Sequence, residues 1–483
     1  MTASSTPSLN AFESLLDSPR VAVDPAVRES YAIDGFAPAG VAKPASVEEA
    51  AEIVRFAVKE KLAVVPVGAR TKLSIGATPI RYDIALDMTA INQMSHYDPA
   101  DLTVSVGAGM PLAELNATLR EHNQFLPLLV PYYSRTTIGG TIASGIDSPL
   151  RQAYGTSRDF LLGAEFIDGT GALVKSGGRV VKNVTGYDLH KLLIGSFGSL
   201  GVITALNFRT FPAPANPRGF LASFSTPEAA LSARRKIAES PLSPLTLDVL
   251  NPLAARIFAE RAPSSPEPPV FAGENHHHVE SPLAAPGEWF HPSDWQLCAA
   301  FAGVPEVLHR YSRDLTRIAE QFGATSISIL DDATRPSIWG RLREALVLVR
   351  ESSPFAVIVK LNVLPSLQAQ ALSILDAVGH AAKIPPALIA RASGTLYIAL
   401  LPLDTAADAF AEPLALLAQE IVSLCHRFEG RASLLFAPPT IKHVLDSTLN
   451  SGHNFDLALM RRVKSAFDPH NIFAPDRLFS PST

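Results

Sequence analysis

The amino-acid sequence predicts an α+β fold divided among more than one domain. At 483 residues the chain is longer than one ordinary hydrophobic core requires, so two or more domains are expected. Short apolar runs typical of buried strands alternate with segments in which apolar residues recur at helical spacing. Three glycine-rich stretches lie in the first half of the chain, each beside a strand-like run. This combination predicts α+β domains, the first of which holds a ligand against its main chain.

The first half of the chain begins with a helix that leads into a strand. In residues 46–60, Ser46 can cap a helix, Glu49 stands three residues later, and apolar residues follow at helical spacing. Residues 62–67 are a short apolar run that predicts a buried strand ending at Gly68. The further elements expected are strands at 84–88, 102–109 and 201–212, a helix at 111–123 with Pro111 in its first position, and a hairpin at 161–177 around Asp168-Gly169.

A second α+β domain is predicted from about residue 216. Residues 262–295 interrupt its pattern, because they are rich in proline and poor in aliphatic residues. We interpret them as a surface insertion with partial disorder, and the histidine run at 276–278 as a solvated loop rather than a metal site. The elements expected around the insertion are strands at 220–225, 245–251, 355–365 and 395–402, and helices at 227–240, 304–323 and 411–427.

Composition excludes several classes of protein. The formal net charge of −5 leaves no basic footprint for nucleic acid. Two distant cysteines, Cys298 and Cys425, cannot build a disulfide framework, which fits a reducing compartment. The first residues lack a basic region followed by an apolar core, and no charge-free apolar window is long enough to span a membrane. We therefore expect a cytoplasmic protein without a signal peptide, which partner subunits could attach to a membrane.

The three glycine-rich stretches, at 66–76, 136–145 and 181–204, predict a large nucleotide cofactor held by main-chain N–H groups. The first follows a buried strand. Its N–H groups, the Thr71 hydroxyl and the charge of Arg70 or Lys72 could cradle a pyrophosphate, although an ordinary turn is the alternative. The candidate residues of this loop are Val67, Gly68, Ala69, Arg70, Thr71, Lys72 and Leu73.

The second and third stretches offer main-chain surface and hydroxyl donors. A glycine pair allows close approach in the second, and an edge strand in the third could hydrogen-bond a ring through its own N–H and C=O groups. A core strand with glycines for tight packing is the alternative for the third stretch, and both interpretations can hold together. The candidates are Ile138, Gly139, Gly140, Thr141, Ser144 and Gly145 in the second stretch and Gly201, Val202 and Ile203 in the third.

The order and content of these stretches resemble the flavin-binding module of the vanillyl-alcohol oxidase / p-cresol methylhydroxylase superfamily. The resemblance covers about residues 36–212 and returns at RRVKSAFDPHNIFAPDRL in the tail. Within that superfamily the third stretch and the tail resemble the FAD-binding subunits of bacterial glycolate oxidases. The resemblance implies a two-lobed FAD-binding module followed by an α+β cap domain. The expected divisions are an N-terminal segment 1–35, an FAD-binding domain 36–215, a cap domain 216–455 containing the insertion 262–295, and a tail 456–483 that returns to the flavin domain.

The resemblance also implies further residues near the flavin. At some other positions this chain differs from the residues that are common in the family. Tyr154, Gly155, Asp159 and Gly163 match positions around the flavin, although Asp159 can equally be a helix cap. Asn471 either contacts the flavin ring or caps a turn. The family commonly has glycine where this chain has Arg70, and Asn-Pro-Gly where it has Ala474-Pro475-Asp476. None of the three loops supplies a His or Cys at a motif position, so non-covalent FAD is expected.

The sequence does not identify a catalytic residue or a metal site. Related hydroxy-acid dehydrogenases carry a histidine cluster in the second domain, and residues 428–439 lack the matching Glu-His pair. The function expected is that of an FAD-binding oxidoreductase subunit in a glycolate-oxidase-like complex that oxidises a 2-hydroxy acid. Its expected partners are a second flavoprotein subunit and an iron–sulfur subunit. The alternatives are a stand-alone FAD-dependent dehydrogenase of a 2-hydroxy acid or alcohol, and a scaffold without flavin.

Overall fold

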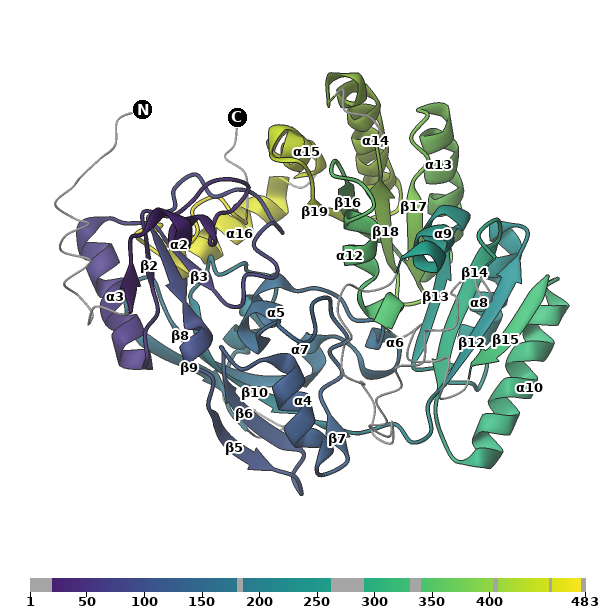
Figure 1. The fold of residues 1–483 in the computed structure, drawn as a ribbon, viewed down its shortest axis with the longest axis horizontal. Helices are drawn as coiled ribbons and strands as arrows, with labels where there is room; N and C mark the ends of the chain where they lie inside the picture. The colour runs from purple at the N-terminus through teal and green to yellow at the C-terminus, as the bar shows by residue number, and fades with distance from the viewer. Residues whose placement is uncertain are drawn as a thin grey trace.

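Two main sheets and a two-stranded pair build the N-terminal half of the chain, and one larger sheet builds the C-terminal half (Figure 1). The computed structural model describes residues 20–179, 186–261, 291–330, 340–402, 407–450 and 454–478. The change from the first half to the second falls between Pro212 and Arg218. The predicted α+β class with two lobes and a cap is confirmed.

The first lobe is a four-stranded sheet in the order β1-β2-β4-β3. Strands β2, β4 and β3 run parallel, and helix α3 covers them as the crossover connection. The hydroxyl of Ser46 accepts the N–H of Glu49, as the capping signal predicted. The elements are β1 (Val21–Ala22), α2 (Pro25–Glu29), β2 (Gly40–Ala42), α3 (Val47–Glu60), β3 (Val64–Val67), β4 (Ile84–Asp87) and η1 (Met88–Ala90). The described part of the expected N-terminal segment 1–35, from Arg20 onward, therefore contributes β1 and α2 to the first lobe.

The second lobe is a five-stranded antiparallel sheet in the order β5-β6-β10-β8-β9. The hairpin expected at 161–177 is present, because the Asp168 carboxylate accepts the N–H groups of Thr170 and Ala172. Pro111 precedes helix α4 as its N-cap instead of opening it. The elements are β5 (Met94–Asp98), β6 (Thr103–Gly107), α4 (Leu112–Arg120), β7 (Gln124–Phe125), α5 (Ile138–Ser144), α6 (Arg151–Tyr154), α7 (Ser157–Phe160), β8 (Leu161–Ile167), β9 (Leu173–Gly177), η2 (Leu189–Leu193), β10 (Val202–Arg209) and β11 (Phe211–Pro212).

The cap is one eight-stranded antiparallel sheet in the order β15-β12-β14-β13-β17-β18-β16-β19. Helices α8, α10, α13 and α14 pack on its outer face, whereas α9, α12 and side chains of the FAD-binding half pack on its inner face (Figure 1). The elements are β12 (Arg218–Phe224), α8 (Pro227–Ala238), β13 (Thr246–Leu250), α9 (Pro252–Glu260), β14 (Trp295–Phe301), α10 (Pro305–Gln321), β15 (Ser326–Leu330), α12 (Ala345–Arg350), β16 (Val357–Asn362), η4 (Pro365–Leu367), α13 (Gln368–Ala381), β17 (Ala387–Arg391), β18 (Thr395–Leu400), α14 (Ala407–Arg427), β19 (Arg431–Phe436) and α15 (Pro439–Asn450).

Several parts of the cap differ from the sequence prediction. Strands β14, β15, β17 and β19 were not predicted, and β14 begins at Trp295, inside the expected insertion. Most of that insertion, including the histidine run, lies outside the described residues. None of the helices in the described part of the chain has the length and apolarity needed to cross a membrane.

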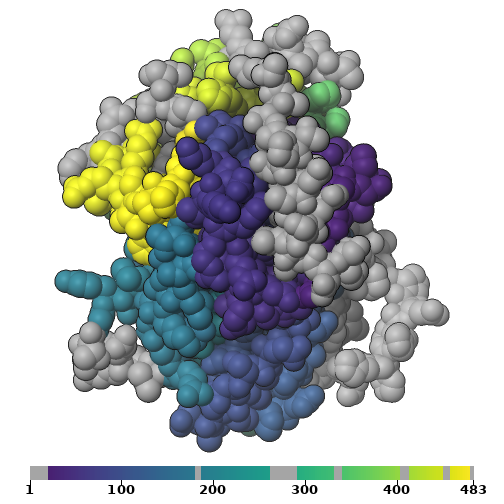
Figure 2. Space-filling view, turned by 90° about the vertical axis from the view of Figure 1, so that its left-hand side faces the viewer, coloured from purple at the N-terminus to yellow at the C-terminus, as the bar shows by residue number. Residues whose placement is uncertain are grey.

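The C-terminal tail returns to the first lobe (Figure 2). After helix α16 (Asn454–Phe467), Phe473 forms a parallel bridge with Val64 along the free edge of β3. The N–H of Val64 donates to the carbonyl of Ile472, and the N–H of Ala474 donates to the carbonyl of Val64. Asp468 holds the turn through the N–H groups of Ile472 and Phe473. The tail thus covers the β3 edge that would otherwise be open.

We predict that Phe473→Ala destabilises the protein by about 3 kcal/mol, because it deletes a fully buried aromatic ring. The exposed neighbour His470 is the matched control, and His470→Ala should change the free energy of unfolding by less than about 0.5 kcal/mol. Chemical denaturation monitored by circular dichroism measures both. Equal stability of the two variants would show that the tail docks only loosely.

Candidate functional site

The three glycine-rich stretches meet at one small cavity of about 40 Å³. Residues 66–68, 137–143 and 198–203 come from strand β3, helix α5 and the start of strand β10, which are distant in sequence. Their convergence is the arrangement that the glycine pattern predicted. The cavity is lined by Pro66, Val67, Gly68, Met88, Ala108, Thr137, Gly139, Gly140, Ala143, Gly198, Gly201 and Ile203.

Most of these glycines are required by close packing of the main chain. A Cβ atom at Gly68 would lie 2.2 Å from the Thr137 hydroxyl, and one at Gly139 would lie 2.7 Å from the Cβ of Ala108. A Cβ atom at Gly201 would lie 2.8 Å from the carbonyl of Ile167. The packing interpretation of these glycines therefore holds, and it does not conflict with a ligand lying over them.

Gly140 is the exception. A Cβ atom there would meet only the Thr137 hydroxyl, at 3.0 Å, and Gly140 lines both the small cavity and a neighbouring one of about 60 Å³. The second cavity is enclosed by Val65, Pro66, Val67, Gly68, Ala69, Arg70, Thr71, Lys72, Leu73, Thr137, Gly140, Ala143, Ser144, Phe197 and Arg477. Gly140 thus leaves room where the groove continues from one cavity to the next.

The first loop presents free main-chain donors to this groove. In the described part of the chain, the N–H groups of residues 69–73 donate no hydrogen bond, while the buried guanidinium of Arg477 binds the carbonyls of Leu73 at 2.5 Å and Ile75 at 3.0 Å. Arg70 has a φ of +61°, the left-handed conformation that favours the glycine common in the family. Its guanidinium turns away to lie 4.5 Å from the centre of the Tyr31 ring and 2.8 Å from the Ser30 hydroxyl. The Arg70 side chain therefore leaves the donor row uncovered.

Lys72 lies beneath the loop. Its ammonium group donates to the hydroxyls of Thr136 and, at 3.3 Å, of Thr71. Burial lowers the pKa of Lys72 to about 7, and the negative charge of Glu344 opposes that shift. An anion bound over the loop would favour the charged form of Lys72.

The hydroxyls of the second stretch serve its own helix. Thr137 caps α5 by accepting the N–H of Gly140 at 3.2 Å. Thr141 donates to the carbonyl of Thr137, and Ser144 donates to the carbonyl of Thr141. Gly145 ends the helix with a φ of +59°. The second stretch is therefore a short helix, where a loop was expected, and Ile138 is buried on its core side.

Of the other residues predicted to lie near the flavin, some pack against neighbouring side chains or main chain, and one lines a cavity. Tyr154 packs edge-on between Phe125 and Phe211, with ring centres 5.3 and 5.1 Å away, and Asp159 forms a capping box with Thr156. These observations support the structural interpretation of both residues, and a role at the cofactor stays a prediction. Gly155 lines a third cavity, Gly163 packs against the β9 end of its hairpin, and Val202 is a core residue of β10.

Asn471 is exposed in the tail turn with a φ of +48°. Its carbonyl accepts a hydrogen bond from Arg81 at 3.0 Å. Asn471 does not line the groove formed by the first two cavities, so its location favours the turn-forming interpretation over ring contact.

The third cavity, of about 260 Å³, lies between the second stretch and the inner face of the cap sheet. Four basic side chains, Arg151, Arg158, Lys191 and Lys360, share its wall with the carboxylate of Asp147. Asp147 already accepts the Thr395 hydroxyl at 3.1 Å and lies 3.5 Å from Arg151. The cavity therefore keeps an excess of positive charge.

Lys360 is one of three neighbouring hydrogen-bond donors on the inner strands of the cap sheet, and Tyr397 and Arg391 are the others. Burial lowers the pKa of Lys360, and no described residue accepts a hydrogen bond from its ammonium. Tyr397 faces Lys360 across the strand pair. Among the described residues, its buried hydroxyl has no hydrogen-bond partner, and neither do Nε and Nη1 of Arg391 beside it. Buried polar atoms without partners are rare in native proteins and indicate a ligand or water.

The sequence prediction missed this basic cavity. Its one signal was Lys360 within an otherwise apolar strand, and the partners come from distant segments. Within the same region, Lys191 forms an ion pair with Asp188 at 2.6 Å, so Arg158 and Lys360 carry most of the uncompensated charge, and His190 is buried against Ser176. Within the described residues, no three His, Cys, Asp or Glu side chains are grouped as a metal site.

Comparison with known proteins identifies the family. Residues 38–177 match the FAD binding domain, and residues 213–433 and 449–478 match the C-terminal domain of FAD linked oxidases. The chain belongs to the FAD-linked oxidases. It is an FAD-linked oxidoreductase, and its N-terminal half is the FAD-binding domain.

Individual relatives and structures agree with this assignment. The chain is 28% identical to a D-2-hydroxyglutarate dehydrogenase of Xanthomonas citri pv. viticola, over 98% of this chain and 97% of that one. It is 36% identical to glycolate oxidase subunit GlcE of Escherichia coli, over 41% of this chain and 55% of that one. The crystal structure of p-cresol methylhydroxylase with substrate bound aligns with a TM-score of 0.73, at 17% identity and over 98% and 97% of the two chains. The fold expected from the superfamily resemblance is confirmed.

The residues of the groove fit FAD. Free N–H groups on the first loop, the Lys72 ammonium and the open side of Gly140 match the needs of a pyrophosphate with its flanking groups. On this basis we propose that the pyrophosphate of FAD lies along the groove formed by the first two cavities.

We predict that Gly140→Ala weakens FAD binding at least tenfold without loss of stability. The added methyl group would enter the groove, whereas alanine inside a helix is favoured over glycine by about 0.5–1 kcal/mol. Titration of apoprotein with FAD and a thermal melt measure the two effects. Gly178→Ala, where a Cβ atom meets nothing within 4 Å, is the control. Unchanged affinity would place the cofactor away from Gly140.

We predict that FAD affinity falls as the pH rises above about 7. Lys72 with a pKa of about 7 is already charged below that pH, so binding an anion above it requires uptake of a proton. Each pH unit should weaken binding up to about tenfold until the pKa of the complex is reached. Fluorescence titration between pH 6 and 9 measures the slope, and Lys72→Met should bind less tightly and remove it. The same slope in both proteins would exclude Lys72 as the linked group.

Proposed function

We propose that the chain is the FAD-binding subunit of a glycolate-oxidase-like complex, and that it binds the carboxylate of a small 2-hydroxy acid in the basic cavity. The observation that carries the proposal is the cavity of about 260 Å³ whose cationic wall faces the end of the flavin groove at Ser144 and Gly145. When bound, FAD supplies the two-electron redox chemistry of such an oxidation.

The chemistry of the wall supports a small carboxylate. Arg151 and Lys360 offer charged donors from the two domains, and charge-assisted hydrogen bonds are the strong means of holding a carboxylate. Tyr397 and Arg391 lie behind Lys360 with buried donors that lack acceptors among the described residues, and they do not line the cavity themselves. The volume suits a molecule of a few carbon atoms rather than a large alcohol.

Assembly with partners is supported by the relative GlcE, whose name describes a subunit of glycolate oxidase. We accordingly propose a second flavoprotein subunit and an iron–sulfur subunit as partners. A stand-alone dehydrogenase is the second candidate, because D-2-hydroxyglutarate dehydrogenase matches over nearly the full length of both chains. With either function, we propose a cytoplasmic location.

The test is flavin reduction by glycolate, D-lactate and D-2-hydroxyglutarate, with the chain purified alone and with its co-expressed neighbours. Lys360→Met should raise the KM for the 2-hydroxy acid at least tenfold, because a charged contact is lost, while the FAD content stays unchanged. Lys175→Met removes an exposed lysine of β9 and is the matched control. Absence of flavin reduction by all three acids in both preparations would refute the proposal.

We also predict that the flavin is bound without a covalent link. The described cysteines, Cys298 and Cys425, are buried in the cap, and no cysteine lines the two cavities of the flavin groove. Acid precipitation should therefore release all yellow colour into the supernatant. Flavin that remains with the pellet would contradict this prediction.

A further inference from the structure

Asp147 is the only carboxylate among the described residues that line the basic cavity, and the other charged side chains of that wall are cationic. It precedes helix α6 on the FAD-binding half and faces the inner side of the cap sheet, where it contacts Thr395 of β18. Its side chain is 5% exposed, so bulk water hardly solvates the charge. A carboxylate buried to this extent requires hydrogen-bond donors.

The described residues supply the Asp147 carboxylate with few donors. Its Oδ2 accepts the Thr395 hydroxyl at 3.1 Å, but that hydroxyl also lies 3.0 Å from Oδ1 of Asn362 and has a single proton for the two acceptors. Its Oδ1 lies 3.5 Å from a guanidinium nitrogen of Arg151, which is long for a hydrogen bond. An ionised carboxylate has about four acceptor positions, so most of those of Asp147 remain available to a ligand or to water.

Lys360 lines the same cavity from the cap, and its ammonium has no hydrogen-bond acceptor among the described residues. Burial lowers the pKa of Lys360, and the charge of Asp147 opposes that shift, so the two groups are close enough to interact electrostatically. In the described part of the chain they nevertheless form no ion pair. The space between them therefore fits a molecule that carries an acceptor for Lys360 and a donor for Asp147.

We propose that Asp147 accepts the hydroxyl group of the 2-hydroxy acid while Lys360 binds its carboxylate. The inference rests on the proposed function for the presence of the acid in the basic cavity. A 2-hydroxy acid carries its hydroxyl on the carbon atom next to the carboxylate, so one small molecule reaches both groups.

This contact makes Asp147 a specificity-determining residue. An acid without the hydroxyl leaves the buried carboxylate short of a donor, which weakens its binding. The 2-oxo acid formed by oxidation turns a carbonyl oxygen toward Asp147, and two acceptors repel each other. The site therefore favours the hydroxy acid over the oxidised product.

The test measures binding to the holoprotein rather than turnover, with two acids that differ by the hydroxyl group. They are 2-hydroxy-2-methylpropanoate, whose C2 carries no hydrogen to be removed, and 2-methylpropanoate. Isothermal titration calorimetry gives both dissociation constants, and the wild type should bind the hydroxy acid about tenfold more tightly. In Asp147→Ala the ratio should fall to within about twofold, and in Asp147→Asn, a neutral acceptor of the same shape, to about threefold. FAD content and a thermal melt verify that each variant is folded.

Asp188→Ala is the matched control for charge. Asp188 pairs at 2.6 Å with Lys191, another cation of the basic cavity, but does not line the cavity itself. Its removal changes the net charge as Asp147→Ala does, so both acids should bind more tightly while their ratio stays at about tenfold. A ratio that falls equally in both variants would assign the effect to charge and overturn the proposal. Equal binding of the two acids by the wild type would overturn it without any variant.

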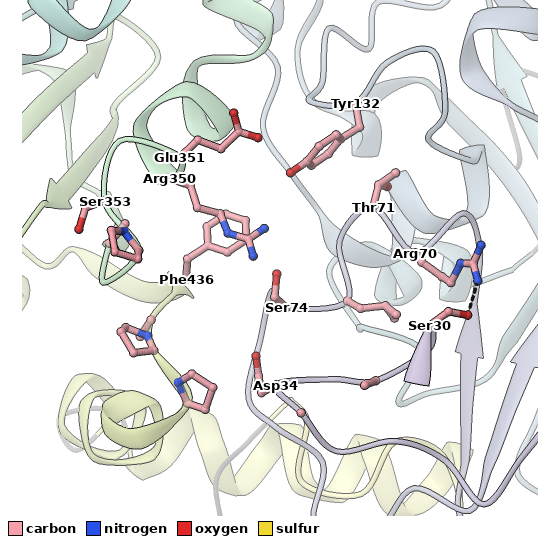
Figure 3. A pocket seen from close by; sticks show the side chains of 18 of the residues that line it. Ser30, Asp34, Arg70, Thr71, Ser74, Tyr132, Arg350, Glu351, Ser353 and Phe436 are labelled. Carbon is pink, nitrogen blue, oxygen red and sulfur yellow. Dashed lines mark hydrogen bonds between the residues drawn. The ribbon is translucent and has the colours of Figure 1, made fainter. Parts of the chain in front are cut away.

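A larger cavity, of about 850 Å³, is the other place where a carboxylate could bind. It lies between the first loop and residues 350–356 and 436–439 of the cap, with Arg70 and Arg350 on its walls (Figure 3). If the acids bind in the basic cavity, Lys360→Met should weaken both about tenfold and Arg350→Ala should weaken neither. The reverse pattern would refute the proposed function and this inference with it. Dependence on Lys360 without a preference for the hydroxy acid would overturn this inference alone.

Discussion

The buried guanidinium of Arg477 is the interaction on which the cofactor loop depends. It binds carbonyls of residues 73 and 75, and the carbonyl of Arg477 in turn accepts the N–H of Ala77. With these carbonyls engaged by Arg477, the N–H groups of residues 69–73 remain for a ligand. The tail that carries Arg477 is itself fixed by the bridge between Phe473 and Val64. A segment at the far end of the chain thereby sets the geometry of a loop near its beginning.

The same loop is joined to the cap by buried charges. Lys442 of α15 reaches Asp34 and also donates to the carbonyl of Ser74 at 2.8 Å. Glu344, which immediately precedes α12, accepts the N–H of Tyr132 at 2.9 Å, and its charge counteracts the lowered pKa of Lys72. Breaking such a buried pair leaves an uncompensated charge, so the two domains resist separation at this point. The groove and the cavities beside it are consequently held in place by contacts between the FAD-binding half and the cap.

The sequence predicted the local features of this site better than the distant ones. The glycine pattern and the strand before Gly68 located the groove, because close main-chain approach has a visible signature in the residues themselves. Helix α5 was mistaken for a loop, since its two glycines hide the helical signal while Thr137 supplies the cap. The basic cavity could not be predicted, because Lys360 and Arg151 are brought together only by the packing of the cap sheet on the first half of the chain.

Departures from the family pattern concern conformation more than contact with the flavin. Arg70, Ala474 and Asp476 replace Gly, Asn and Gly, and all three adopt positive φ values of +61°, +41° and +59°. Left-handed backbone costs an ordinary residue about 1 kcal/mol, which glycine avoids and asparagine reduces. Arg70 recovers stabilisation through the Tyr31 ring, and burial raises the pKa of Asp476 while Lys464, Arg461 and Arg81 oppose that shift. Left-handed backbone is thus adopted here without glycine, because the surrounding contacts hold the loop and the tail in place.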